Sequence, residues 1–388
     1  MAALLSAMLL VVLVFLTFIA FVIAMMNGTA YLIPLIIVLP TVLYLAVSLS
    51  LYKFFTTRKR IFTFIGIASI ALAITGYVPI REAYTESIPT VDEEANPMFY
   101  EPYRADSKLA ELETPASLKF QEPLPKLDGE TWLYPMYAAF VQAVYPEGAY
   151  PAYTADGLVM EDSRGYAFTH LIEGKADLIF TTAPMKWQYK KAEEAGLELT
   201  VTPIGKEAFV FFVNEKNPVQ NLKSQQIREI YGGTTENWKE VSGQDKPIIA
   251  YQRKTNSRSQ KALEQFMDGT PLMKPATEDE FEDGYGIVQQ RAEYRNYKNA
   301  FGFSHRFTTL ELVEKHKIKL LNIDGVAPTN DSIRSGEYPL VREFYAVTAG
   351  TDNPNVQQFI DWMVSEEGQR LLEKSGYVSL REGTKEQQ

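Results

Sequence analysis

The sequence of 388 residues contains no cysteine and only three histidines. The missing cysteine excludes disulfide scaffolds, thiolate zinc sites, cysteine nucleophiles and a lipid-modified cysteine. His170, His305 and His316 are scattered along the chain without the clustering that metal ligands need, so we predict no metal site and no cofactor. The net charge of −10 also argues against a nucleic-acid partner.

The motifs of the commonest hydrolases and nucleotide-binding enzymes are also missing. The chain has no P-loop, no G-x-S-x-G and no HExxH. It also lacks an obvious nucleophile–base pair, which a phosphate-ester enzyme would need. We therefore predict no catalytic residue and expect a protein that is not an enzyme.

Acidic residues are absent from the first 80 positions, whose only charged side chains are Lys53, Arg58, Lys59 and Arg60. The rest of the chain holds 34 basic and 48 acidic residues, a net charge of −14. Three apolar runs, 1–26, 31–52 and 61–80, fill this first segment. Each reaches the roughly 20 residues that a helix needs to cross a bilayer. We predict a three-helix transmembrane anchor over residues 1–80.

The four basic residues lie in one short loop, which the positive-inside rule places in the cytoplasm. The second span then ends inside, the third returns outward, and everything after Arg81 is extracytoplasmic. The expected localisation is the cell membrane, multi-pass, with the lipid bilayer as a partner. A cleaved signal peptide is the alternative for the first run, but it lacks a basic n-region and exceeds the usual apolar length.

Residues 81–116 are acidic, contain prolines and show no clear periodicity. This composition is typical of an extended or partly ordered linker. We predict an extracytoplasmic stalk here, before a binding domain over residues 117–388.

Strand-like and helix-like segments alternate after the stalk. Examples are the apolar run 177–180, the β-rich run 208–213 and the helical patterns 132–144 and 257–267. Such alternation predicts an α/β fold with parallel sheets covered by helices. About 270 residues exceed the usual size of one such sheet, so we expect two lobes.

Strand-to-helix turns are the places to search for a ligand site, because helix N-termini present free N–H groups. Any one hydroxyl in such a turn is explained by helix capping. Several donor-rich turns in one chain, with an arginine in one of them, favour an oxyanion. The donor-rich turns are 128–135, 161–165, 181–184 and 251–260.

Long stretches of the chain from about residue 117 to 380 resemble the phosphate-binding proteins of ABC transporters, which have the type II periplasmic binding protein fold. They are LDGETWLYPMYAAFVQAVYP, GKADLIFTTAP, QQIREIYGGTTENWKEVSGQDKPIIAYQR, SRSQKALEQFM and DGVAPTNDSIRSGEYPLVREFYAVT. The resemblance implies two lobes that close on an anion, with the chain crossing between them twice. Lobe 1 would hold about 117–205 plus 325–388, and lobe 2 about 206–324.

The resemblance also implies the ligand-binding residues. Arg253 would be the main counter-charge, and the Trp132 amide would add a donor at a helix start. Side-chain hydroxyls would complete the shell, and the neighbouring Arg258 is a further candidate because it adds positive charge. The remaining implied positions are Thr131, Ser163, Thr181, Thr182, Ser257 and Ser259.

Some positions depart from the family pattern. Thr182 stands where family members often carry an acid that accepts the proton of hydrogen phosphate. Glu130 stands where a small residue is usual, and its carboxylate would be unfavourable beside an anion unless it points away or is protonated. Arg258 replaces a glycine, and Arg164 adds further charge; a solvated rim charge is the alternative for both.

The leading hypothesis is a membrane-anchored solute-binding protein that captures inorganic phosphate or a similar oxyanion for ABC-type import, with an ABC permease as partner. The alternative is a membrane-bound anion sensor that signals through its helices to a partner such as a sensor kinase. The three-span anchor favours the sensor, because simple delivery needs only one tether.

Overall fold

A computed structural model describes residues 1–91, 97–154, 156–253, 257–274, 280–282, 288–290, 294–315 and 317–381. The chain divides into two compact units, residues 1–89 and 90–388, which are described separately below. The five residues 92–96 of the predicted stalk lie outside the described residues.

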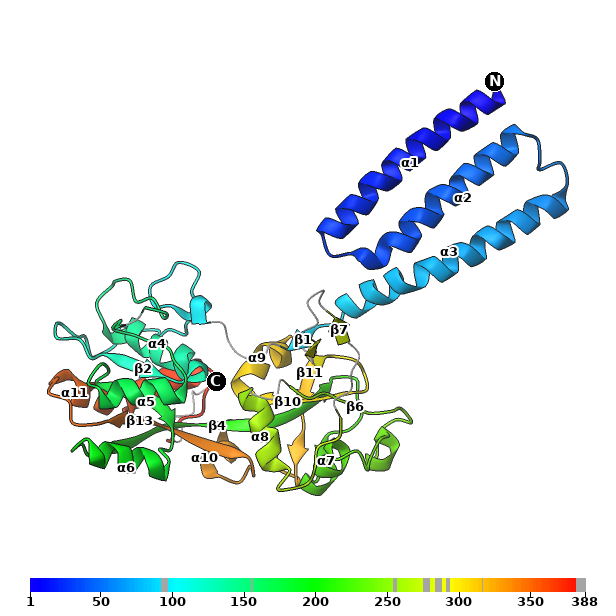
Figure 1. The fold of residues 1–388 in the computed structure, drawn as a ribbon. Helices are drawn as coiled ribbons and strands as arrows, with labels where there is room; N and C mark the ends of the chain where they lie inside the picture. Colours follow the sequence, from blue (N-terminus) through cyan, green and yellow to red (C-terminus); the bar gives the residue numbers. More distant parts are fainter. Residues whose placement is uncertain are drawn as a thin grey trace. The chain divides into compact units, whose positions relative to one another are not determined.

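The first unit consists of long apolar helices that lie side by side (Figure 1). Hydrogen bonds between Ser6 and the hydroxyls of Tyr44 and Ser48 join the first helix to the second. Three helices in the described part of the chain are long and apolar enough to cross a membrane, in agreement with the predicted apolar runs. The elements are α1 (Ala2–Met26), η1 (Ala30–Leu32), α2 (Ile33–Leu51) and α3 (Arg58–Glu86).

A seven-stranded sheet runs through the second unit, in the order β2-β3-β13-β4-β10-β6, with β11 also paired to β4. The long strand β4 continues from one lobe into the other (Figure 1). The strands are β2 (Leu127–Gly129), β3 (Leu178–Thr182), β4 (Thr200–Asn214), β6 (Ile249–Ala250), β10 (Ala300–His305), β11 (Ile318–Leu320) and β13 (Val341–Thr348). Short strand pairs are β1 (Thr90–Val91) with β9 (Tyr294–Arg295), β5 (Asn221–Leu222) with β12 (Asn322–Ile323), and β7 (Glu280–Glu282) with β8 (Val288–Gln290).

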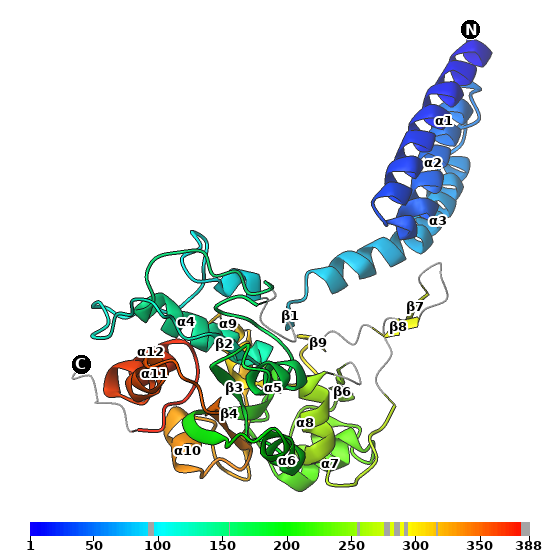
Figure 2. The same ribbon diagram turned by 60° about the vertical axis from the view of Figure 1, so that its left-hand side comes forward.

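Helices cover this sheet in two groups, and each group encloses its own apolar core. Figure 2 shows α4, α11 and α12 gathered on the first lobe and α7 and α8 on the second. The first lobe holds η3 (Thr131–Leu133), α4 (Tyr134–Val144), α5 (Arg164–Ile172), α6 (Lys186–Glu194), α11 (Asn355–Met363) and α12 (Glu366–Lys374). The second holds α7 (Ser224–Tyr231), η4 (Trp238–Val241), α8 (Arg258–Phe266) and α10 (Asn330–Ser335), while α9 (Arg306–Glu314) follows β10.

The sheet is mixed, which corrects the expectation of purely parallel sheets. β2 pairs parallel with β3, and β10 pairs parallel with β6. β13 is antiparallel to both β3 and β4, and β10 is antiparallel to β4. The reason is that β4 carries the chain into the second lobe and β13 carries it back, so these neighbouring strands run in opposite directions.

The return crossing lies later than the sequence predicted. Residues from 325 onward were expected in the first lobe, but Ile333 and Tyr338 are buried in the second core. The Tyr338 hydroxyl donates to the Phe209 carbonyl oxygen at 3.2 Å, which holds this segment there. The crossing falls within β13, where Val341 packs against the second core and Phe344 belongs to the first.

The segment 97–116 differs from the predicted stalk, because it packs on the first lobe. Tyr100, Tyr103 and Leu109 lie against the first core, starting with η2 (Pro97–Tyr100). The Tyr103 hydroxyl donates to the carbonyl oxygens of Gln142 and Tyr145. Apolar and aromatic side chains spread through an acidic segment therefore find a place on the lobe, although they form no periodic pattern.

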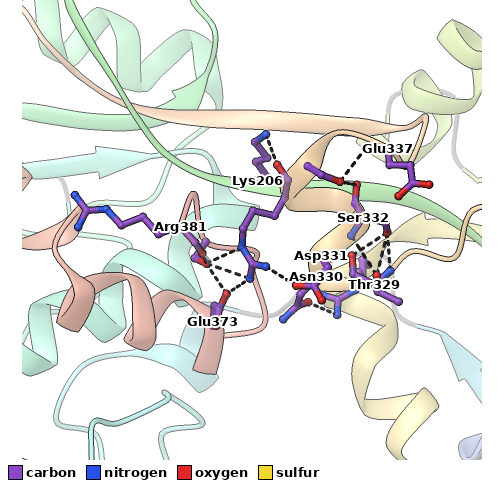
Figure 3. A network of polar contacts seen from close by, with 12 residues as sticks. Lys206, Thr329, Asn330, Asp331, Ser332, Glu337, Glu373 and Arg381 are labelled. Atoms are coloured by element: carbon purple, nitrogen blue, oxygen red, sulfur yellow. Dashed lines mark hydrogen bonds and ion pairs between the residues drawn. The ribbon is translucent and has the colours of Figure 1, made fainter. Parts of the chain in front are cut away.

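A polar network joins the lobes beside the crossing strands (Figure 3). Arg334 on α10 pairs with Glu373 on α12 at 2.6 Å and with Asp331 on its own helix. The Lys206 ammonium donates to the Arg334 carbonyl oxygen, and Ser379 donates to Glu373. Because α10 belongs to the second core and α12 to the first, these contacts hold the lobes together at their junction.

Candidate anion-binding site

Glu130 lies at the carboxyl end of β2, where the chain turns into η3. Its backbone N–H donates to the Phe180 carbonyl oxygen at 3.0 Å, and its carbonyl oxygen accepts from the Leu133 N–H at 2.7 Å. The first bond fixes Glu130 beside β3, and the second starts the helical turn. The residue is only 3% exposed.

The first carboxylate oxygen of Glu130 accepts hydrogen bonds from β3 and from the start of α5. Thr181 donates through its hydroxyl at 2.7 Å, and Thr182 through its N–H at 3.1 Å and its hydroxyl at 3.3 Å. The Arg164 Nε lies 3.0 Å from the same oxygen. The end of one strand and the start of one helix of the first lobe thus converge on a single oxygen.

The second carboxylate oxygen contacts both lobes. The Trp132 indole donates to it at 3.1 Å, and the Arg258 Nη2 from α8 lies 3.2 Å away. The Arg258 guanidinium also lies 4.9 Å from the centre of the Trp132 ring. The Trp132 ring also stacks on the ring of His305 at the end of β10, with 5.6 Å between the ring centres. Glu130 and Trp132 therefore connect the first lobe to the second.

The surrounding charges keep the Glu130 carboxylate ionised. Burial by itself opposes ionisation, but Arg258 and Arg164, with the hydrogen bonds from Thr181 and Thr182, outweigh it and lower the pKa to about 2. From the sequence, a carboxylate here was expected to be unfavourable beside an anion unless it pointed away or was protonated. It does neither, because the arginines and hydroxyls of the site surround it.

Two further side chains close the site from the second lobe and from β13. Burial, together with Arg258 and Arg342, lowers the pKa of His305 to about 3, so its ring is neutral at physiological pH. Arg342 lies within electrostatic reach of Arg164 and Glu130, and burial lowers its pKa. The site is therefore rich in positive charge, balanced by one buried carboxylate.

The structure brings together only part of the residue set implied by the resemblance. Thr181, Thr182, the Trp132 side chain and Arg258 meet at the Glu130 carboxylate. The others lie on adjacent helix starts. Thr131 begins η3, Ser163 is the exposed N-cap of α5, Ser257 caps α8 by accepting from the Gln260 N–H at 3.2 Å, and Ser259 is buried in the first turn of α8.

Arg253, the implied main counter-charge, follows β6 in the second lobe. It is 7% exposed, its N–H donates to the Gln260 side chain at 2.8 Å, and its charge lowers the pKa of the buried Tyr231 and Tyr294 hydroxyls against the larger effect of burial. Among the described residues, it makes no contact with the Glu130 carboxylate. The charge partners seen there are Arg258 and Arg164.

Glu130 was not predicted from the sequence to be the central acceptor. His305 and Arg342 were not predicted to lie near it. For His305 the sequence indicated only that it is not part of a metal-binding cluster. One signal was present: Glu130 and Arg258 both depart from the family pattern, and two departures of opposite charge can compensate each other when their positions meet in space.

Asp128, Asp162 and His170 form the one group of possible metal ligands found among the described residues. The His170 Nδ1 lies 2.7 Å from Asp128 Oδ2 and 3.7 Å from Asp162 Oδ2. The shorter distance is that of a hydrogen bond, so the Asp128–His170 pair accounts for the cluster without an ion.

Together, the fold and the donor-rich strand and helix ends define the class of a two-lobed binding protein. The family comparison agrees with this class: a model described as a PBP superfamily domain matches residues 124–367. The chain belongs to the PBP superfamily, and the predicted fold class is confirmed. Membership places it among the substrate-binding proteins of transporters, not among enzymes.

Two curated relatives are phosphate-binding proteins. The chain is 25% identical over 216 residues to the phosphate-binding protein PstS of Borreliella burgdorferi, covering 54% of this chain and 76% of the relative. It is 25% identical over 228 residues to the phosphate-binding protein PstS of Staphylococcus aureus, covering 57% of this chain and 68% of the relative.

Solved structures show a similar match. An ABC-type phosphate transport receptor from Vibrio cholerae has a TM-score of 0.47 at 19% identity, covering 66% of this chain and 98% of that chain. A putative phosphate ABC transporter substrate-binding protein from Clostridium perfringens has a TM-score of 0.45 at 22% identity. The match covers 66% of this chain and 99% of that chain.

Proposed function

We propose that this protein captures phosphate or a related oxyanion outside the cell and delivers it to an ABC-type permease. One observation carries the proposal: two arginines, two threonines and an indole N–H from both lobes converge on one buried anionic group. Charge-assisted hydrogen bonds of this kind are the strong ones, and the arginine fork suits a tetrahedral or planar oxyanion. The names of the curated relatives make phosphate the first anion to test.

Binding is tested with the full chain in detergent micelles, by isothermal titration with phosphate, sulfate and a phosphate monoester. We expect saturable phosphate binding. Arg253→Ala is expected to abolish it, as the family resemblance implies, whereas Arg370→Ala on the surface of α12 is the matched control. If no anion in the panel binds at millimolar concentration, the proposal fails.

We further propose that α1, α2 and α3 anchor the protein in the membrane, with the basic junction between α2 and α3 inside and residues 90–388 outside. The loop between α2 and α3 and the first turn of α3 together hold all basic residues of the first 80 positions, which supports this orientation. Because the chain has no cysteine, a single introduced cysteine reports one position. Lys216→Cys should react with an impermeant maleimide on intact cells, and Thr56→Cys only after permeabilisation. The reverse pattern would overturn the orientation.

A sensor is the second candidate, and the three-helix anchor is the observation that favours it. One helix or a lipid is enough to tether a binding domain, whereas three packed helices can pass a change to a membrane partner. Crosslinking in membranes separates the candidates. Capture of a permease supports import, and capture of a kinase whose activity follows phosphate concentration supports sensing.

A further inference from the structure

The Glu130 carboxylate occupies the point at which donors from both lobes converge. Its backbone belongs to the first lobe, yet its second oxygen pairs with Arg258 on α8 of the second lobe. Trp132, two residues on, repeats the crossing through Arg258 and His305. A single short segment of β2 and η3 therefore contacts the second lobe three times.

The carboxylate has the contacts expected of a bound oxyanion. It accepts from two hydroxyls, one backbone N–H, one indole N–H and two guanidinium groups, at 2.7–3.3 Å. A free phosphate that used these donors would lie within a few ångströms of the carboxylate, and like charges at that distance repel strongly at a buried site. The two anions cannot share the donors.

We propose that Glu130 is a tethered anion that competes with free oxyanions for these donors and draws the two lobes together when no oxyanion is bound. This inference rests on the proposed function. A group tethered by a short backbone acts at an effective concentration of about millimolar or more. A free oxyanion must then displace the carboxylate. The protein therefore binds phosphate when its concentration is high and leaves it unbound when its concentration is low.

The first test compares phosphate affinities of full-length variants in detergent micelles by isothermal titration. Glu130→Ser removes the carboxylate and restores a small residue, and Glu173→Ser removes a surface carboxylate that pairs with Lys175. We expect inorganic phosphate to bind Glu130→Ser at least 10-fold more tightly than wild type, and Glu173→Ser as wild type does. Equal affinity of Glu130→Ser and wild type would overturn the inference while leaving the proposed function intact.

The second test measures the distance between the lobes without relying on affinity. Spin labels at Lys191→Cys on α6 and Gln225→Cys on α7 mark exposed positions of the two lobes, and no natural cysteine interferes. We expect one narrow distance distribution for the otherwise wild-type chain without phosphate. We expect a broader distribution for Glu130→Ser, which narrows again on adding phosphate.

The outcomes separate the two claims. An unchanged distribution in Glu130→Ser would overturn the role of Glu130 in drawing the lobes together. A broadened distribution with no phosphate binding in either protein would support that role and would defeat the proposed function. Glu130→Gln guards against misfolding, because it keeps the shape of the side chain and removes its charge; it should broaden the distribution as Glu130→Ser does.

Discussion

Asp128 and Glu130 lie two residues apart at the end of β2, and their surroundings shift their pKa values in opposite directions. Burial and the neighbouring Asp162 raise the pKa of Asp128 to about 6, although His170 and the Gly129 N–H partly offset this. Two arginines lower the pKa of Glu130 to about 2 despite its burial. Glu130 meets Arg164 and Arg258, whereas Asp128 meets His170 and lies near the Asp162 carboxylate.

Glu130 should stabilise the outer unit against acid. Its folded pKa lies below the ordinary value of 4.5, so its contribution is complete above pH 4.5 and is lost as the pH falls toward 2. The shift corresponds to roughly 3 kcal/mol of unfolding free energy. Urea unfolding followed by tryptophan fluorescence at pH 6, 4 and 3 measures it. All four tryptophans lie in residues 90–388, so the signal reports that unit.

Glu130→Gln removes the group that titrates, so its unfolding free energy should change less between pH 5 and 3 than that of the wild type. Glu198→Gln, a change at an exposed position of the same lobe, is the control and should retain the wild-type slope. Identical slopes for Glu130→Gln and wild type would contradict the ionised, arginine-paired state of Glu130.

Asp128 should have the opposite effect. Its folded pKa of about 6 exceeds the ordinary 3.8, so the folded chain holds this proton more tightly than the unfolded chain. Stability from this group is complete below pH 3.8 and falls as the pH rises through 6. Asp128→Asn should therefore gain up to about 3 kcal/mol relative to wild type between pH 4 and 7. The same urea titration measures it, with the surface change Asp361→Asn as control; a constant difference across this range would refute the raised pKa.

Much of the architecture could be predicted from local patterns in the chain. The apolar runs predicted three helices of membrane-spanning length, and the alternation of strands and helices predicted two α/β lobes. Thr181 and Thr182 could be selected as candidates because they lie at the carboxyl end of a strand, where the structure places them beside Glu130. The antiparallel pairs could not be predicted, because they depend on where β4 and β13 cross between the lobes.

The centre of the site was harder to predict for a related reason. The direction of the Glu130 side chain is decided by Arg164 and Arg258, which reach it from α5 and α8, and no local pattern records that meeting. The segment 97–116 was misjudged because its aromatic side chains follow the surface of the first lobe and not the period of a helix or a strand. In both cases the deciding contacts are tertiary.

Arg258 should supply a large part of the affinity for phosphate once the carboxylate is removed. In the Glu130→Ser background, Arg258→Ala should weaken phosphate binding by about 10- to 100-fold, since a hydrogen bond to a charged group contributes roughly 1.5–3 kcal/mol. Arg370→Ala in the same background, a change at an exposed α12 position, should leave the affinity unchanged. Isothermal titration gives both values, and equal affinities for the two double variants would mean that the anion binds away from Arg258.

Gly129 holds the end of β2 close to β3, and a side chain there should displace Glu130. A Cβ at this position would lie 2.9 Å from the Phe180 carbonyl oxygen and 2.9 Å from the Tyr137 ring, whose stacked contact with the Phe180 ring leaves little room to move. Gly129→Ala should cost about 1–3 kcal/mol of unfolding free energy, as overpacking of a core does. Gly165→Ala is the matched control, because its Cβ meets open space in an exposed helical position, and it should be neutral or stabilise by up to about 1 kcal/mol. Urea unfolding measures both variants. Because the strand must shift to admit the methyl group, the unfolding free energy of Gly129→Ala should also change less between pH 5 and 3 than that of the wild type. A destabilised variant that kept the full wild-type change would show that the position of Glu130 does not depend on the β2–β3 contact.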